Sequence, residues 1–151
     1  MSEVALTGKD TIILNNRLFT SFADNDVAAL TFPNDLMTVK TGKNGNSIYA
    51  FNNTGRQCDF NLRLLRGSKD DKFLAGILAG LMSDPASFTL MIGEFVKKIG
   101  LGNGTFCLDT YVLSGGTPIR QVDGKENVDG DSESAIAVWR FKFTNAPRSL
   151  T

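Results

Sequence analysis

The sequence contains no histidine. Histidine is the side chain that most often serves as a general base or as a metal ligand, so its absence excludes every Ser-His and Cys-His catalytic arrangement. Carboxylates alone could still act as acid and base, but no pair of acidic residues stands out as a catalytic pair. The sequence therefore favours a non-enzymatic protein that uses no cofactor and no metal.

Cysteine, excess charge and long apolar runs are also scarce. Cys58 and Cys107 lie far apart and outside any CxxC pattern, so we expect two reduced thiols in the interior. The 16 basic and 16 acidic residues give a net charge of zero, unlike a strong nucleic-acid or membrane-surface binder. No apolar run approaches the roughly 20 residues that span a bilayer, and the N-terminus lacks a signal-peptide pattern. We expect one domain over residues 1–151, made in a cytoplasm.

Glycine-rich turns divide most of the chain into short strand patterns. Apolar runs flank Asn15 and Asn16, which predicts a hairpin over residues 11–22. Residues 57–65 alternate between apolar and polar side chains, which is typical of a half-buried strand. Further strands are predicted over residues 27–32, 88–99, 105–113 and 133–144, with turns at residues 100–104 and 114–116.

One segment has helical periodicity. Ser68 and Asp71 are spaced as a capping box, and apolar residues recur at helical intervals until Asp84 and Pro85. This pattern predicts a helix over about residues 69–83. The chain is therefore expected to be mainly β, an antiparallel β-sandwich or split barrel with one packed α-helix.

A long connection separates the early strands from the strand over residues 57–65. Residues 33–55 are rich in Gly and Asn and include a single short strand pattern, over residues 47–51. Connections of this length in compact domains are usually functional or mobile. In addition, the strand over residues 88–99 is apolar on both faces, and one small domain cannot bury both. Both features indicate contact with another subunit.

Three segments resemble binding sites for a metal, a phosphate or a base, and a purely structural interpretation is preferred for each. Residues 123–133 are acidic, with Asn127, Asp129, Asp131 and Glu133 at alternating positions, but no frame fits an EF-hand loop, so a solvated loop is preferred. The glycines of residues 100–104 precede a strand and not a helix, so a turn is preferred over a phosphate site. Trp139, Phe141 and Phe143 share one strand face and are interpreted as core residues, not as a base-stacking platform.

Several of these features occur together in one known family. They are the N-terminal hairpin, the connection with Val39-Lys40-Thr41-Gly42-Lys43-Asn44-Gly45-Asn46, the strand Arg56 to Leu65, the helix opened by Ser68-Lys69-Asp70-Asp71, and the final strand ending in Trp139-Arg140-Phe141-Lys142-Phe143. This layout resembles the tail tube proteins of contractile-tailed bacteriophages (myovirus type) and the related tube proteins of pyocins and type VI secretion systems. The resemblance runs from about Thr7 to Thr144, and Lys40 to Arg66 is its most specific stretch.

The resemblance implies a structural virion protein of a viral tail, assembled in the cytoplasm of a bacterial host. Copies of the chain would form hexameric rings stacked helically into a tube within a contractile sheath, with sheath, baseplate (initiator) and terminator proteins as partners. DNA would pass through the channel during genome ejection without specific binding, and no membrane would be bound. Residues 33–55 would join subunits and rings, with Asp59 and Glu94 as candidates for a channel wall that is commonly acidic. The residues assigned to this inter-subunit segment are Pro33, Val39, Lys40, Lys43, Asn44, Asn46, Tyr49, Asn52 and Asn53.

A second hypothesis requires no assembly. A small β-sandwich could bind a carbohydrate or another ligand in an exposed aromatic cleft. Tyr49, Phe51 and Tyr111 are the aromatic residues that could line such a cleft.

Overall fold

The computed structural model describes residues 3–6, 8, 10–23, 27–124 and 132–151, and the fold is mainly β with one α-helix, as predicted. The strands are β1 (Ala5–Leu6), β2 (Thr11–Leu14), β3 (Arg17–Leu18), β4 (Ala28–Thr31), β5 (Met37–Thr41), β6 (Ser47–Phe51), β7 (Cys58–Leu65), β8 (Met91–Gly100), β9 (Phe106–Pro118), β10 (Ile136–Asn145) and β11 (Arg148–Leu150). The helix is α1 (Lys69–Ser83), and short 3-10 helices cover Asn53–Arg56, Pro85–Ser87 and Ser132–Ala135.

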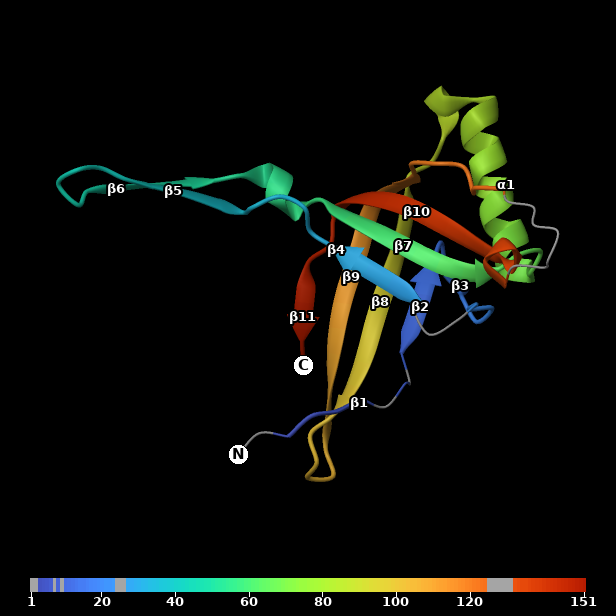
Figure 1. The fold of residues 1–151 in the computed structure, drawn as a ribbon, viewed down its shortest axis with the longest axis horizontal. Helices are drawn as coiled ribbons and strands as arrows, with labels where there is room; N and C mark the ends of the chain where they lie inside the picture. The colour runs from blue at the N-terminus through green and yellow to red at the C-terminus, as the bar shows by residue number, and fades with distance from the viewer. Residues whose placement is uncertain (1–2, 7, 9, 24–26, 125–131) are drawn as a thin grey trace.

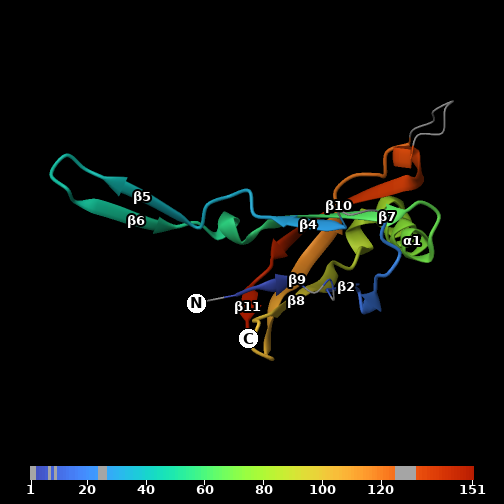
Figure 2. The ribbon, with the colours of Figure 1, turned by 60° about the horizontal axis from the view of Figure 1, so that its bottom comes forward.

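Nine of these strands form one antiparallel sheet. Its order is β3-β2-β8-β9-β10-β7-β4, with β1 paired to β8 and β11 paired to β9. The sheet is strongly bent, so β4, β7 and β10 cross above the upper ends of β8 and β9, while α1 stands at one end (Figures 1 and 2). No helix of the described residues is long and apolar enough to cross a membrane.

The predicted turn of the N-terminal hairpin and the alternation of β7 are confirmed, whereas the second strand of the hairpin ends at Leu18 and not at Phe22. Asn15 and Asn16 both adopt positive φ, at 49° and 64°, which is the geometry that a two-residue hairpin turn requires. In β7 the apolar residues of the alternation are fully buried and the polar ones are half-buried. The turn residues therefore predicted the position of the hairpin turn, and the alternation predicted which side chains of β7 are buried.

The turn predicted at residues 114–116 is wrong. β9 continues through these residues to Pro118, so the two glycines lie inside a strand. Gly115 has a φ of 64°, and a Cβ on Gly116 would lie 2.2 Å from the Phe143 ring. The register of β8 against β9 also shifts here, between Met91 and Gly93. The glycines therefore mark a bulge and a close contact within the sheet, two other reasons for glycine in a β-rich chain.

The core lies between the crossing halves of the bent sheet. Trp139 is 2% exposed, and Phe141 and Phe143 are fully buried, so the interpretation as core residues is confirmed. Phe60 packs edge-on against Phe95 and Phe143, which ties the two halves of the sheet together. Met91 and Leu113 complete the interior from β8 and β9.

Cys58 and Cys107 differ in their surroundings. Cys58 is fully buried in β7, and this burial raises the pKa of its thiol to about 11. Cys107 on β9 is half-buried, and both thiols are free. Because only the thiolate reacts, a disulfide-exchange reagent at pH 8 should label Cys107 and should label Cys58 only after unfolding. Two labels on the native protein would contradict this burial, and a Cys107→Ser variant identifies the site.

A buried carboxylate joins α1 to the N-terminal hairpin. Ser68 caps the helix by accepting a hydrogen bond from the Asp71 amide, as the sequence predicted. Asp70, 2% exposed, accepts hydrogen bonds from the Arg17 guanidinium at 3.0 Å and from the amides of Thr20 and Ser21 at 2.9 Å. This arrangement fixes the position of α1 on the sheet.

Candidate functional site: an exposed hairpin arm and the groove at its root

Residues 33–55 form an ordered projection where the sequence indicated an open connection with a single strand. β5 and β6 pair with each other and with no other strand, in a register that places Val39 opposite Tyr49. The two-stranded ribbon extends well away from the sheet in both views (Figures 1 and 2). We call residues 37–51 the arm. All of its strand residues are exposed, and the rest of the chain supports the arm at its root, where the Arg56 guanidinium lies 5.3 Å from the centre of the Phe51 ring.

The arm has one strongly apolar face. Cross-strand pairing places Met37 beside Phe51 and Val39 beside Tyr49 on the same face. These four side chains are 47% to 68% exposed. The opposite face is mixed: Thr38 and Lys40 lie across from Ala50 and from Ile48, which is 69% exposed. An isolated two-stranded hairpin is marginally stable in water, and a continuous exposed apolar face marks an interaction surface. The arm therefore has the features of an element that becomes buried against another molecule.

The tip and the root hold the arm in a defined shape. At the tip, the Gly42 amide donates to the Asn46 carbonyl at 2.7 Å, and Gly45 has a φ of 84°. At the root, the Asn52 amide donates to the Leu36 carbonyl at 2.7 Å. A Cβ on Gly55 would lie 2.7 Å from the backbone of Asp35 and Leu36, so only glycine permits this close crossing. The direction of the arm is thus fixed where it leaves the sheet.

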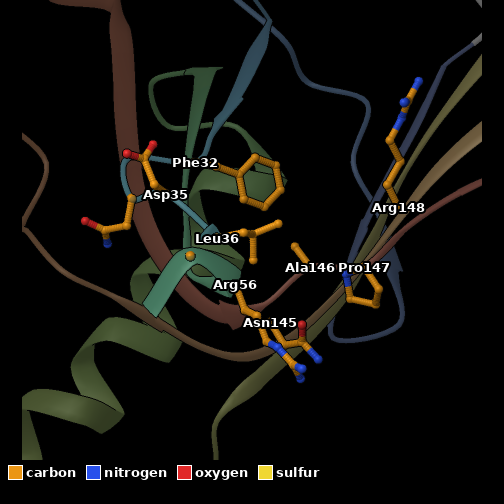
Figure 3. Close-up of a pocket in the computed structure, with 10 residues that line it drawn as sticks. Phe32, Asp35, Leu36, Arg56, Asn145, Ala146, Pro147 and Arg148 are labelled. Carbon is orange, nitrogen blue, oxygen red and sulfur yellow. The ribbon is translucent and has the colours of Figure 1, made fainter. Parts of the chain in front are cut away.

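A groove of about 550 Å³ lies at the root of the arm. Phe32 and Leu36 face Ala146 and Pro147 across it, whereas the carboxylate of Asp35 points away (Figure 3). Arg148 lies at one side, where its guanidinium forms a two-pronged pair with Asp109 at 2.8 and 3.0 Å. The groove joins the arm to the connection between β10 and β11. Sequence analysis missed it because one wall comes from residues 32–56 and the other from residues 145–148, which are far apart in the chain.

The sequence-predicted inter-subunit residues all lie on the arm or at its root. Val39, Lys40 and Tyr49 are on its strands, and Lys43, Asn44 and Asn46 are at its tip. Pro33, Asn52 and Asn53 lie at the root, where Asn52 donates to the Thr38 hydroxyl at 2.7 Å. The structure thus brings them together on one projection.

Asp59 and Glu94 lie on the face of the nine-stranded sheet that points away from the core. Asp59 is half-buried on β7, opposite Lys142 on β10, and Arg63 and Arg140 occupy the same face. Glu94 is exposed on β8, with Ile13 and Val112 as its cross-strand neighbours. The region around Asp59 is therefore basic, and the region around Glu94 is apolar.

Residues proposed for other sites are dispersed. Neither Tyr49 nor Phe51 nor Tyr111 lines the groove, so they do not form one aromatic cleft there. Asn127, Asp129 and Asp131 lie outside the described residues. Within the described part of the chain, no group of three His, Cys, Asp or Glu side chains could hold a metal ion.

Comparison with known proteins gives no assignment. No family model matches the chain, and its sequence matches no curated protein.

Proposed function

We propose that this chain is a structural subunit that assembles with copies of itself into stacked rings around a channel. The observation that carries the proposal is the arm: an ordered, exposed hairpin with an apolar face that its own chain leaves uncovered. Because Met37, Val39, Tyr49 and Phe51 are 47% to 68% exposed, burying them against another copy would supply, for each, roughly half of the 1.5–3 kcal/mol that full burial of a large apolar side chain gives.

The arm projects from one side of the body, and we infer that it docks on the body of the next copy, which is a different surface. Two copies that exchange arms reciprocally close a dimer, whereas an arm that docks on a third copy continues the assembly. Contacts between unlike surfaces are head-to-tail, and they generate a ring when the rotation closes or a helical filament when it does not. A tube of stacked rings has both arrangements, because each ring is closed and successive rings repeat along a helical axis.

The likeness in layout to contractile-tail tube proteins extends the proposal to a specific role. In that role the chain forms hexameric rings of a phage tail tube, located in the virion, through which DNA passes without specific binding. Sheath, baseplate and terminator proteins are then its partners. The missing histidines and the zero net charge agree with a passive conduit and not with a catalyst or a DNA-binding protein.

Sedimentation velocity across a concentration series tests the proposal. The purified chain should be monomeric when dilute and should convert to large, discrete species as its concentration rises. A single monomeric species at every concentration would contradict it. That outcome would favour the second candidate, a small binding module, because the groove volume of about 550 Å³ falls in the range of small-molecule sites.

A further inference from the structure

The surface that receives the arm can be identified by charge and hydrophobicity. This question rests on the proposed function, since it assumes that the arm docks on a second copy. The arm carries Lys40 and Lys43 and no acidic residue between residues 37 and 51. Its receptor should therefore combine exposed apolar side chains with negative charge.

The outward face of the nine-stranded sheet has two regions that differ in both properties. The region on β7 and β10 presents Arg63, Arg140 and Lys142, with Asp59 among them and Asp123 at 3.7 Å from Arg140, so basic side chains outnumber acidic ones there. This basic surface would repel the lysines of the arm. The region on β2, β8 and β9 presents Ile92, which is 51% exposed, and Val112, which is 45% exposed, on either side of Glu94.

The second region is also hollowed. The residues that line a depression of about 380 Å³ here include Ile13, Ile92, Glu94 and Val112. A Cβ on Gly93 would point to the inner side of the sheet, 2.5 Å from the Ile13 carbonyl and 2.6 Å from the buried Leu14 side chain, so glycine here permits the close packing of β2 on β8 beside the depression. Among the described residues, Glu94 takes part in no ion pair, and the same holds for Lys43 at the arm tip.

We propose that the arm of one copy docks on the outward face of β2, β8 and β9 of a second copy. The apolar face of the arm covers Ile92 and Val112, and Lys43 pairs with Glu94. Lys40 points to the other side of the arm, because it lies opposite Ile48 and not on the face of Val39 and Tyr49. This docking assigns Glu94 to a contact between copies in place of the channel wall, and it leaves Asp59 as the remaining candidate for the wall.

Charge reversal tests the pairing. Lys43→Glu and Glu94→Lys should each raise the concentration needed for assembly roughly tenfold, and the double variant should recover most of the loss because the pair is restored with opposite polarity. Lys72→Glu and Asp84→Lys, at exposed positions of α1 and its C-terminal end, are matched controls that should leave the assembly concentration nearly unchanged. Circular dichroism of the dilute proteins checks that each variant is folded.

Cross-linking between distinguishable copies tests the geometry. One copy carries Val39→Cys and the other Val112→Cys, both on a Cys107→Ser background, and the two copies differ by an affinity tag. We expect a disulfide between unlike copies at assembly concentrations, and none with Thr38→Cys on the opposite arm face. If the chain assembles but forms no such cross-link, and the double charge-reversal variant does not recover assembly, the proposed docking surface is wrong while the proposed function stands. The absence of any assembly would contradict the proposed function and this inference together.

Discussion

Removing the arm is expected to abolish assembly while leaving the body of the chain folded. The Asn52 amide already donates to the Leu36 carbonyl, so these residues are close enough to be joined by a two-residue turn. Replacing residues 37–51 with Asn-Gly would close the hairpin at its root. Because the arm strands contact no strand of the main sheet, the free energy of unfolding should change by about 1 kcal/mol or less.

The effect on assembly should be much larger than the effect on stability. Loss of the apolar arm face removes several kcal/mol of burial from every contact between copies, which corresponds to a change of more than a hundredfold in affinity. Sedimentation at concentrations where the full chain assembles should therefore find only monomers of the shortened chain.

Two double variants test whether assembly depends on the apolar face of the arm or only on the arm being present. Val39→Ser with Tyr49→Ser should behave like the deletion, whereas Thr38→Ala with Lys40→Ala, on the opposite face, should assemble. Normal assembly of the shortened chain would contradict the assignment of this face. The same loss of assembly in both double variants would contradict it as well.

Replacing Asp70 is expected to have the largest effect on stability. Asp70→Ala leaves the amides of Thr20 and Ser21 without their acceptor and the partly exposed Arg17 without its partner. Losing a buried, charge-assisted set of hydrogen bonds should cost about 2–4 kcal/mol in the free energy of unfolding. Chemical denaturation measures this loss. The exposed Asp84→Asn, at the other end of α1, should change stability by about 0.5 kcal/mol or less.

The pH dependence gives an independent check on the same carboxylate. Burial by itself would raise the pKa of Asp70, but the hydrogen bonds from Ser21, Thr20 and Arg17 outweigh it and lower the pKa below its ordinary value of 3.8. A lowered pKa in the folded state means that the carboxylate stabilises the fold above pH 3.8, and that this stability is lost as the pH falls through the folded-state pKa. The stability difference between the native chain and Asp70→Asn should therefore be constant near neutral pH and shrink in strong acid. A difference that grows on acidification would contradict this role.

The sequence predicted those elements whose signals are local. Ser68 with Asp71, the positive-φ pair Asn15 and Asn16, and the alternation of β7 each lie within a few neighbouring residues, and each was confirmed. The fold class followed from them. The 3-10 helix after the arm and the short edge strands β1 and β11 were missed, because pairing with β8 and β9 creates the edge strands and their own sequence does not.

Two segments were misjudged because the same residues serve different structural purposes. Gly115 and Gly116 are typical of a turn, yet here they accommodate a bulge and the Phe143 ring. The Gly/Asn cluster of residues 42–46 was interpreted as part of an open connection, but it is the turn of a hairpin. The side chains of β5 alternate between its two faces, with Met37 and Val39 on one face and Thr38 and Lys40 on the other. The groove at the arm root could not be predicted at all, since its walls meet only in the folded chain.

Negative-stain electron microscopy of the purified chain, across a concentration series, tests whether copies assemble into rings and tubes through the arm. We expect hollow rings at intermediate concentration and tubes of stacked rings at high concentration, and neither from the chain that lacks residues 37–51. Uniform single particles at every concentration, or identical assemblies with and without the arm, would contradict this expectation.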